Sequence, residues 1–326
     1  MKFVPLVLAL LLAVVPAAQG ADADFKQSPA YEGLAASYIV TSATKGDDDT
    51  VVVGFKQSGE VADLSGGFAI LKREKDDWFP VYGCWFEGYY PSNVSVSGRD
   101  VSMKLVKTTL SGENTKSLTL SYGKDYVYNR DSGSPFSGAK TAASSTAAKG
   151  GAKPEHVFDG EPGTAWAEGA EGTGIDEWVA VQFARPANVG IVGIVPGLFI
   201  GKEKQWKDNN RLNRGELKLD IAEEKGDVAS RIDFEKDLGL TIGGDTVEMT
   251  FPNRKSMRFF EVKRRGVKEV KVVITSVYLG DKHDDTYIAE VVPFVLITPD
   301  RKPAQDAKPD EKAAEPAKPV EKKGEN

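Results

Sequence analysis

The sequence contains very few of the residues that act as nucleophiles or proton shuttles in enzymes. Its 326 residues include one cysteine, Cys84, and two histidines, His156 and His283. A single cysteine excludes a disulfide within the chain. Because Cys84 lies among the aromatic residues of VYGCWFEGYY, we expect a buried, unreactive thiol; a reactive thiol or a disulfide-linked dimer is the alternative.

The chain also lacks the short motifs of common catalytic sites. The nucleophile elbow G-x-S-x-G, the zinc motif H-E-x-x-H and the phosphate-binding loop are all absent. A carboxylate pair for glycoside hydrolysis needs no short motif, but no pattern in the sequence marks one. We therefore predict that the protein is not an enzyme.

An excess of positive charge is missing as well. The 42 Lys and Arg residues are outnumbered by 48 Asp and Glu residues, which leaves a net charge of -6. A nucleic-acid partner requires a basic face, so this balance argues against one.

Long hydrophobic runs are confined to the start of the chain. The apolar run Phe3–Val15 is too short to span a bilayer comfortably. Lys2 precedes this run, and the small residues of Ala18-Gln19-Gly20 follow it as a cleavage site. Residues 1–20 therefore read as a cleaved signal peptide, which predicts a secreted or periplasmic bacterial protein without a transmembrane anchor.

Short β-type runs dominate the chain from residue 36 onward. TVVVGFK, GGFAILKRE and VSMKLVKTT are rich in β-branched and aromatic residues, and turn residues separate such runs at a spacing of about 10 residues. This pattern predicts a small antiparallel β-domain of unknown type within residues 22–130. Residues 131–150, rich in Ser, Gly, Ala and Lys, are a predicted linker, although the segment TAASST also fits the first strand of the next unit.

A second β-rich segment covers residues 151–298. Alternation is clear in VAVQF and VKVVI, and about eight strand-like runs point to a single sandwich or jelly-roll. Residues 299–326 contain Pro, Lys, Ala and Glu but no aromatic residue. Such a composition cannot bury a core, so we expect a disordered tail.

Several spaced motifs in the second segment occur in a recognisable order. They are HVFDGEPGTAWAEG at 156–169, GTGIDEWVAVQFARPANVGIVGIVPG at 172–197, NNRLNRGELKLDI at 209–221 and VVITSVYLGDKHDDTYIAEVVPF at 272–294. This order resembles the discoidin (F5/8 type C) group, and most closely its bacterial branch, the NADase-type glycan-binding domain. The resemblance covers about residues 141–297. It implies an all-β fold with a C-terminal galactose-binding-like jelly-roll, preceded here by the smaller antiparallel β-domain.

The same resemblance implies a structural calcium ion. In related jelly-rolls a D-G-x-x-x-T turn wraps the ion, and a Glu on the last strand completes the shell. The matching positions here are Asp159, Thr164 and Glu290, whose oxygens are of the type calcium prefers. The alternative is that Asp159 and Thr164 only close the turn through local hydrogen bonds.

In such domains the ligand docks on loops at one end of the sandwich. The best candidate in this sequence is the loop 197–214, which offers the aromatic ring of Trp206 beside hydrogen-bonding groups on Asn210, Arg211 and Arg214. Stacking combined with fork-like donors can hold a sugar ring. The alternative is that Arg211 is tied within the fold and that Trp206 lies flat on the domain.

These features favour a secreted, non-catalytic protein that binds a glycan or a cell-envelope polysaccharide. A module that binds a protein partner, or an envelope scaffold, would use the same fold, because function resides in the loops. An exposed Trp and Arg in a groove would favour the glycan, and a flat apolar patch would favour the protein partner.

Overall fold

A computed structural model describes most of the chain between Ala23 and Asp300. The predicted signal peptide lies outside the described part, as does the predicted tail beyond Asp300. The described residues are 23–46, 49–59, 64–75, 77–109, 111–122, 134–148, 151–161, 163–199, 203–222 and 245–300.

The N-terminal half is a small antiparallel β-unit, as the sequence predicts. A 3-10 helix, η1 (Ala23–Gln27), and a short helix, α1 (Pro29–Ala35), precede it. Strands β1 to β4 follow one another in one sheet, and β5 to β7 form a separate three-stranded sheet. The strands are β1 (Tyr38–Lys45), β2 (Thr50–Gln57), β3 (Gly66–Glu74), β4 (Asp77–Phe86), β5 (Tyr90–Ser97), β6 (Asp100–Thr109) and β7 (Gly112–Ser121).

Side chains of β1 tie the two N-terminal sheets together. The hydroxyls of Thr41 and Thr44 donate hydrogen bonds to the carbonyls of Pro91 and Val94 on β5, at 2.9 and 2.7 Å. These bonds give hydrogen-bond partners to backbone carbonyls of β5 that would otherwise have to bond to water. Phe68 on β3 and Phe55 on β2 are fully buried on opposite faces of the first sheet.

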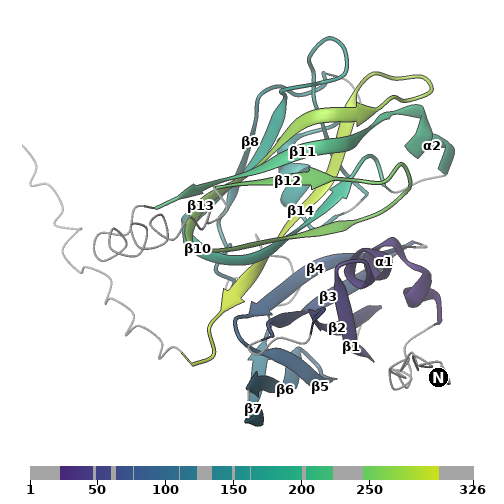
Figure 1. Ribbon diagram of the computed structural model, residues 1–326. Coiled ribbons are helices and arrows are strands. Elements are labelled where there is room, and N and C mark those ends of the chain that lie inside the picture. Colours follow the sequence, from purple (N-terminus) through teal and green to yellow (C-terminus); the bar gives the residue numbers. More distant parts are fainter. Residues whose placement is uncertain are drawn as a thin grey trace, which may run out of the picture.

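The C-terminal half is the predicted jelly-roll, so the predicted fold class is confirmed. Its antiparallel strands enclose a core that includes the fully buried Trp166 and the nearly buried Phe158. Figure 1 shows these strands grouped above the N-terminal unit. The elements are β8 (Lys140–Ala143), η2 (Pro154–Phe158), β9 (Trp166–Ala167), β10 (Trp178–Pro196), α2 (Glu203–Asp208), β11 (Asn210–Ile221), β12 (Thr246–Thr250), β13 (Arg258–Tyr278) and β14 (Thr286–Ile297).

The long strands β10 and β13 each contribute to both layers of the jelly-roll. The first part of β10 pairs with β8, and its second part pairs with β14. The register between β10 and β13 shifts between Gln182 and Ala187, a stretch that contains Pro186, which has no backbone N–H to donate. A short parallel pairing of β11 with β14 joins the two layers at one end.

The segment predicted as a linker, residues 131–150, contains an ordered strand, which agrees with the alternative that TAASST begins the next unit. Strand β8 pairs antiparallel with β10. Phe136 anchors the chain just before this strand, since its ring is fully buried and lies 4.8 Å from the ring of Phe183. The small residues of β8 gave only a weak strand signal, so the jelly-roll begins earlier than residue 151.

Strand β14 joins the two halves of the chain. It runs from the jelly-roll towards the N-terminal unit (Figure 1), where Val295, Leu296 and Ile297 pair in parallel with β4. Just beyond it, Asp300 accepts hydrogen bonds from the hydroxyl of Tyr89 at 2.7 Å and from Lys116 at 3.0 Å. The start of the predicted disordered tail is therefore held on the N-terminal unit.

Close packing at this junction leads to a prediction about Gly83 on β4. A Cβ atom added there would lie 2.1 Å from the ring of Phe294 on β14. We expect Gly83→Ala to lower the free energy of unfolding by about 1–3 kcal/mol, because the ring has no free space to enter. Urea titration followed by circular dichroism measures this change. The control Ser97→Ala, at an exposed position, should stay within about 0.5 kcal/mol, and equal effects of the two variants would contradict the packing argument.

Candidate functional site

The predicted ligand-binding loop, residues 197–214, contains helix α2, which packs against the domain. This helix carries Trp206, whose side chain is only 4% exposed. The guanidinium of Arg211 lies over the indole ring, 4.7 Å from its centroid. The ring is therefore covered by a cation of the same chain and offers no free face for a sugar.

Arg211 is tied to the backbone of the surrounding loops. One guanidinium nitrogen, Nη1, donates to the carbonyls of Lys207 and Asn209 at 3.0 and 2.9 Å. The other, Nη2, donates to the carbonyl of Leu279 at 3.1 Å and to Oδ1 of Asn253 at 3.2 Å. Burial lowers the pKa of Arg211 from its usual value, but several acceptors satisfy the charge.

Asn210 fixes the neighbouring loop between β13 and β14. Its side chain is fully buried, its Oδ1 accepts the backbone N–H of Gly280 at 2.7 Å, and its Nδ2 donates to the carbonyl of Asp284. A glycine is required at 280, because a Cβ atom there would lie 2.5 Å from the backbone of Asn209. Trp206, Asn210 and Arg211 thus form a buried scaffold that shapes the loops at this end.

The expectation that these three side chains contact a glycan is therefore corrected. They are buried and bonded to their own chain, which is the alternative considered for Trp206 and Arg211 in the sequence. Arg214, the fourth predicted residue, differs from them because it is exposed. Within the described part of the chain it has neither a hydrogen bond nor an ion pair. The sequence could not separate the two arginines, since both lie in the run NNRLNR.

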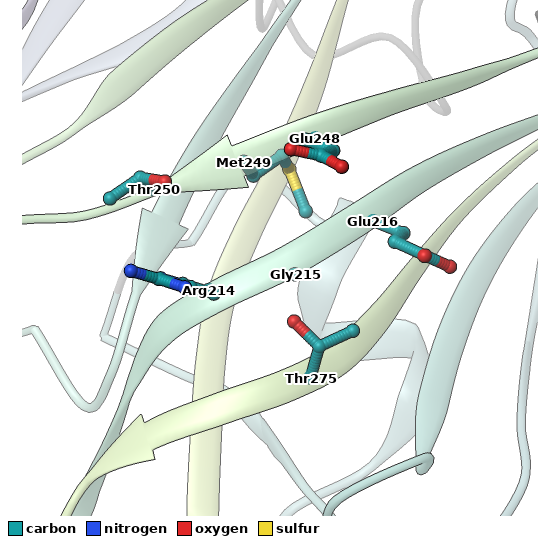
Figure 2. A pocket seen from close by; sticks show the side chains of 7 residues that line it. All are labelled: Arg214, Gly215, Glu216, Glu248, Met249, Thr250 and Thr275. Carbon is teal, nitrogen blue, oxygen red and sulfur yellow. The ribbon is translucent and has the colours of Figure 1, made fainter.

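Arg214 lines a pocket of about 460 Å³ on the outer surface of the sheet formed by β12, β11 and β13. Figure 2 shows the side chains around it. The lining is largely polar and contains no aromatic residue, so a ligand here would be held by charge and hydrogen bonds. The lining residues are Arg214, Gly215, Glu216, Glu248, Met249, Thr250 and Thr275.

The sequence predicts the strand that completes this pocket, but not its place beside Arg214. Glu248 and Thr250 come from TVEMT, a short run in which exposed and buried positions alternate. The alternation predicts a strand but gives no sign that its exposed face lies beside Arg214. Only the pairing of β11 with β12 brings these residues together.

The predicted calcium residues do come together at the turn that follows η2. The hydroxyl of Thr164 lies 2.9 Å from Oδ2 of Asp159 and 2.8 Å from the carbonyl of Glu161. The backbone N–H of Glu161 donates to Oδ1 of Asp159 at 2.8 Å. These local bonds are the alternative that the sequence left open, and they preorganise the oxygens in either case.

Glu290 on β14 reaches this turn from inside the domain. It is 3% exposed, and its Oε1 has no hydrogen-bond partner. Burial raises the pKa of Glu290 well above its usual range, and the neighbouring carboxylate of Asp159 raises it further. The backbone N–H groups of Gly160 and Glu161 act in the opposite direction. Two carboxylates that meet in a buried place require a shared proton or a cation.

The described residues offer neither a ready-made metal cluster nor a membrane-spanning helix. They contain no group of three or more His, Cys, Asp and Glu side chains placed to hold a metal ion. A calcium ion at Asp159 and Glu290 would therefore depend on hydroxyl and carbonyl oxygens for the rest of its shell. No described helix has the length and the apolar character needed to cross a membrane.

Arg211 and Arg214 form a matched pair for mutation, because they lie three positions apart on one strand. We expect Arg211→Ala to lower the free energy of unfolding by about 3 kcal/mol or more, since several buried carbonyls lose their donor. Arg214→Ala should change it by no more than about 0.5 kcal/mol. Thermal and urea unfolding of both variants measure this contrast, and a mild effect of Arg211→Ala would show that the scaffold does not depend on its guanidinium.

Comparisons with known proteins give one family match and several similar solved structures. Residues 133–294 match the family described as the NAD glycohydrolase translocation F5/8 type C domain. The search of curated proteins found no relative. Similar solved structures include the family 32 carbohydrate-binding module of C. perfringens NanJ in complex with galactose, at 17% identity and a TM-score of 0.33, covering 48% of this chain and 93% of that one.

Two further structures have comparable scores. The lectin domain of lectinolysin complexed with Lewis B antigen is 19% identical, with a TM-score of 0.33, and the match covers 48% of this chain and 93% of that chain. An F5/8 type C domain of a Bacteroides fragilis protein is 17% identical, with a TM-score of 0.32, and the match covers 49% of this chain and 93% of that chain. The family match, the order of the motifs and the jelly-roll architecture lead to one conclusion: residues 133–294 form a discoidin-like (F5/8 type C) domain.

Proposed function

We propose that this chain is an exported, non-catalytic carbohydrate-binding protein whose discoidin-like domain holds a glycan. The observation that carries the proposal is the polar pocket of about 460 Å³ beside Arg214. It offers a free guanidinium, two carboxylates and two hydroxyls, which are the groups that bind sugar hydroxyls. Affinity per site is modest, because each hydrogen bond to a sugar replaces one to water.

The state of the nucleophile and base candidates supports a non-catalytic role. Burial raises the pKa of the Cys84 thiol to about 12, so the reactive thiolate does not form near neutral pH. His156 lies 3.2 Å from the carbonyl of Ala165 through Nδ1, and no serine hydroxyl is bonded to its ring in the described part of the chain. His283 is exposed on the loop after β13.

The N-terminal leader supports export to the periplasm or to the outside of the cell. The positive Lys2, the apolar run Phe3–Val15 and the small residues at 18–20 are the features of a cleaved signal peptide. In either location the available ligands include cell-envelope polysaccharides and glycans of neighbouring cells.

A second candidate is favoured by the matched family, which is named for NAD glycohydrolase translocation. In that case the domain would bind a protein partner, either for translocation or as an envelope scaffold. The loop after β13 offers a contact point, because Leu279 is 64% exposed there. A protein partner would bind at this end of the domain and not at the polar pocket.

A glycan array of the mature chain tests the first proposal. We expect bound glycans to be lost or weakened about tenfold in Arg214→Ala, because charge-assisted hydrogen bonds to the pocket disappear. Arg185→Ala, which removes an exposed cation outside the pocket, is the control and should bind as the wild type does. A blank array, together with capture of one envelope protein that depends on Leu279, would overturn carbohydrate binding in favour of the second candidate.

We further propose that one structural calcium ion binds at Asp159, Thr164 and Glu290. The unpartnered Oε1 of Glu290, placed against Asp159, supports this proposal. The ion would neutralise the two carboxylates and would join the turn to the last strand. Its role would be to hold the turn, since the polar pocket has none of these residues in its lining.

The raised pKa of Glu290 predicts how stability depends on pH. Without calcium, the folded state holds the proton of Glu290 more tightly than the unfolded chain, whose glutamates have a pKa of about 4.3. The stabilisation from this proton is complete below that pH and is lost as the pH rises towards the raised pKa. Calcium needs both carboxylates ionised, so its effect grows over the same range.

Calorimetry with a chelator and with added calcium tests whether Glu290 and Asp159 form the calcium site. In chelator, Glu290→Gln should gain thermal stability relative to the wild type as the pH rises from about 5 to about 8, because the amide never ionises. Calcium should raise the melting temperature of the wild type at about pH 8 but not that of the variant. Glu155→Gln, at an exposed position on η2, is the control. A calcium response that Glu290→Gln retains would exclude this site.

A further inference from the structure

The charges around the polar pocket are separated along the strands. Arg214 lies directly opposite Thr250, and Glu216 lies directly opposite Glu248, in the pairing of β11 with β12. Residues that face each other across a ladder share one face of the sheet. In Figure 2 the guanidinium lies at one end of the group and the two carboxylates lie at the other. Two residues along a strand span about 7 Å.

The protein itself neutralises only one of the three charged side chains around the pocket. Glu216 is paired with Lys218 at 2.8 Å, but Glu248 and Arg214 have no ion pair within the described part of the chain. Like charges directly opposite each other on two strands destabilise the pairing. The Glu216–Glu248 pair is therefore an unfavourable arrangement that a bound cation would relieve, and Arg214 offers the complementary position for an anion.

Irregular pairing beside the pocket sets its shape. The register between β11 and β13 shifts on both sides of Arg214, so that Asn213 and Thr275 fall outside the regular ladder. Asn213 is held there by a hydrogen bond from its Nδ2 to the hydroxyl of Ser276 at 3.0 Å. Such bulges redirect side chains, and here Thr275 is exposed and lines the pocket.

We infer that the pocket selects a sugar that carries both an ammonium group and an anionic group, an inference that rests on the proposed carbohydrate binding. The ammonium lies at Glu216 and Glu248, the carboxylate or phosphate lies at Arg214, and the hydroxyls of Thr250 and Thr275 contact the ring hydroxyls. Because the lining has no aromatic ring, stacking contributes nothing, and neutral hydrogen bonds alone bring little net affinity. Each of the two charges therefore adds to the affinity.

Four sugars that differ in these two charges test the inference. Muramic acid carries both charges, glucosamine only the ammonium, N-acetylmuramic acid only the carboxylate, and N-acetylglucosamine neither. Titrated into the full mature chain at low salt and followed by NMR chemical shifts, muramic acid should bind about tenfold more tightly than either singly charged sugar. Added salt should reduce this preference.

Matched variants locate the two charge contacts. Arg214→Gln should remove the advantage of muramic acid over glucosamine, and Glu248→Gln should remove its advantage over N-acetylmuramic acid. Arg185→Gln should retain both advantages. The mutated side chains are exposed, so thermal unfolding should show all three variants folded.

The possible failures are distinguishable. Equal binding of the four sugars, with hits on the glycan array, would overturn the charge selection and leave carbohydrate binding intact. A preference for muramic acid that survives both Arg214→Gln and Glu248→Gln would overturn this pocket as the site. No binding of any of the four sugars, together with a blank array, would overturn both the inference and the proposed function.

Discussion

The pairing of strand β14 is the constraint on which the rest of the structure depends. This strand pairs with β10 and β9 within the jelly-roll, meets β11 where the two layers join, and continues into a parallel pairing with β4 of the N-terminal unit. It also carries Glu290 towards the turn at Asp159, and Phe294 against Gly83. A one-residue slip would turn each side chain of this largely buried strand to the opposite face. One register therefore fixes the junction, the carboxylate pair and the loop end together.

The two surfaces near β11 differ in structure, and the proposed binding role falls to only one of them. At the start of the strand, the side chains of Asn210 and Arg211 form hydrogen bonds with backbone groups of the loops. Buried backbone groups in irregular loops need such partners. Three residues later, Arg214 points away from the domain and meets no partner within the described residues. Rigid loops and a strand-based pocket suit recognition, because groups on strands are held more precisely than groups on loops.

The sequence predicted the fold well because its signals were periodic or local. Alternation in VAVQF and the glycines of the turn at 156–169 indicated the jelly-roll, and the oxygens of Asp159 and Thr164 lie together as expected. Burial was harder to predict. Trp206 and Arg211 are residue types that often bind sugars, yet in this fold the guanidinium of Arg211 stacks on the indole ring of Trp206. Strand β8 was predicted only as an alternative to a linker, because Thr and Ala carry little signal. The neighbours of Arg214 on β12 are brought near only by long-range pairing.

The central claim is that the sheet face formed by β11 and β12, not the loop end, receives the ligand. Backbone amide chemical shifts of the isotope-labelled mature chain, recorded during titration with a glycan that the chain binds, test it most directly. The account predicts that the largest shifts fall at residues 214–216 and 248–250, with small shifts at 206–211 and 279–285. The reverse pattern, with the largest shifts in the loops around Trp206 and Leu279, would contradict it.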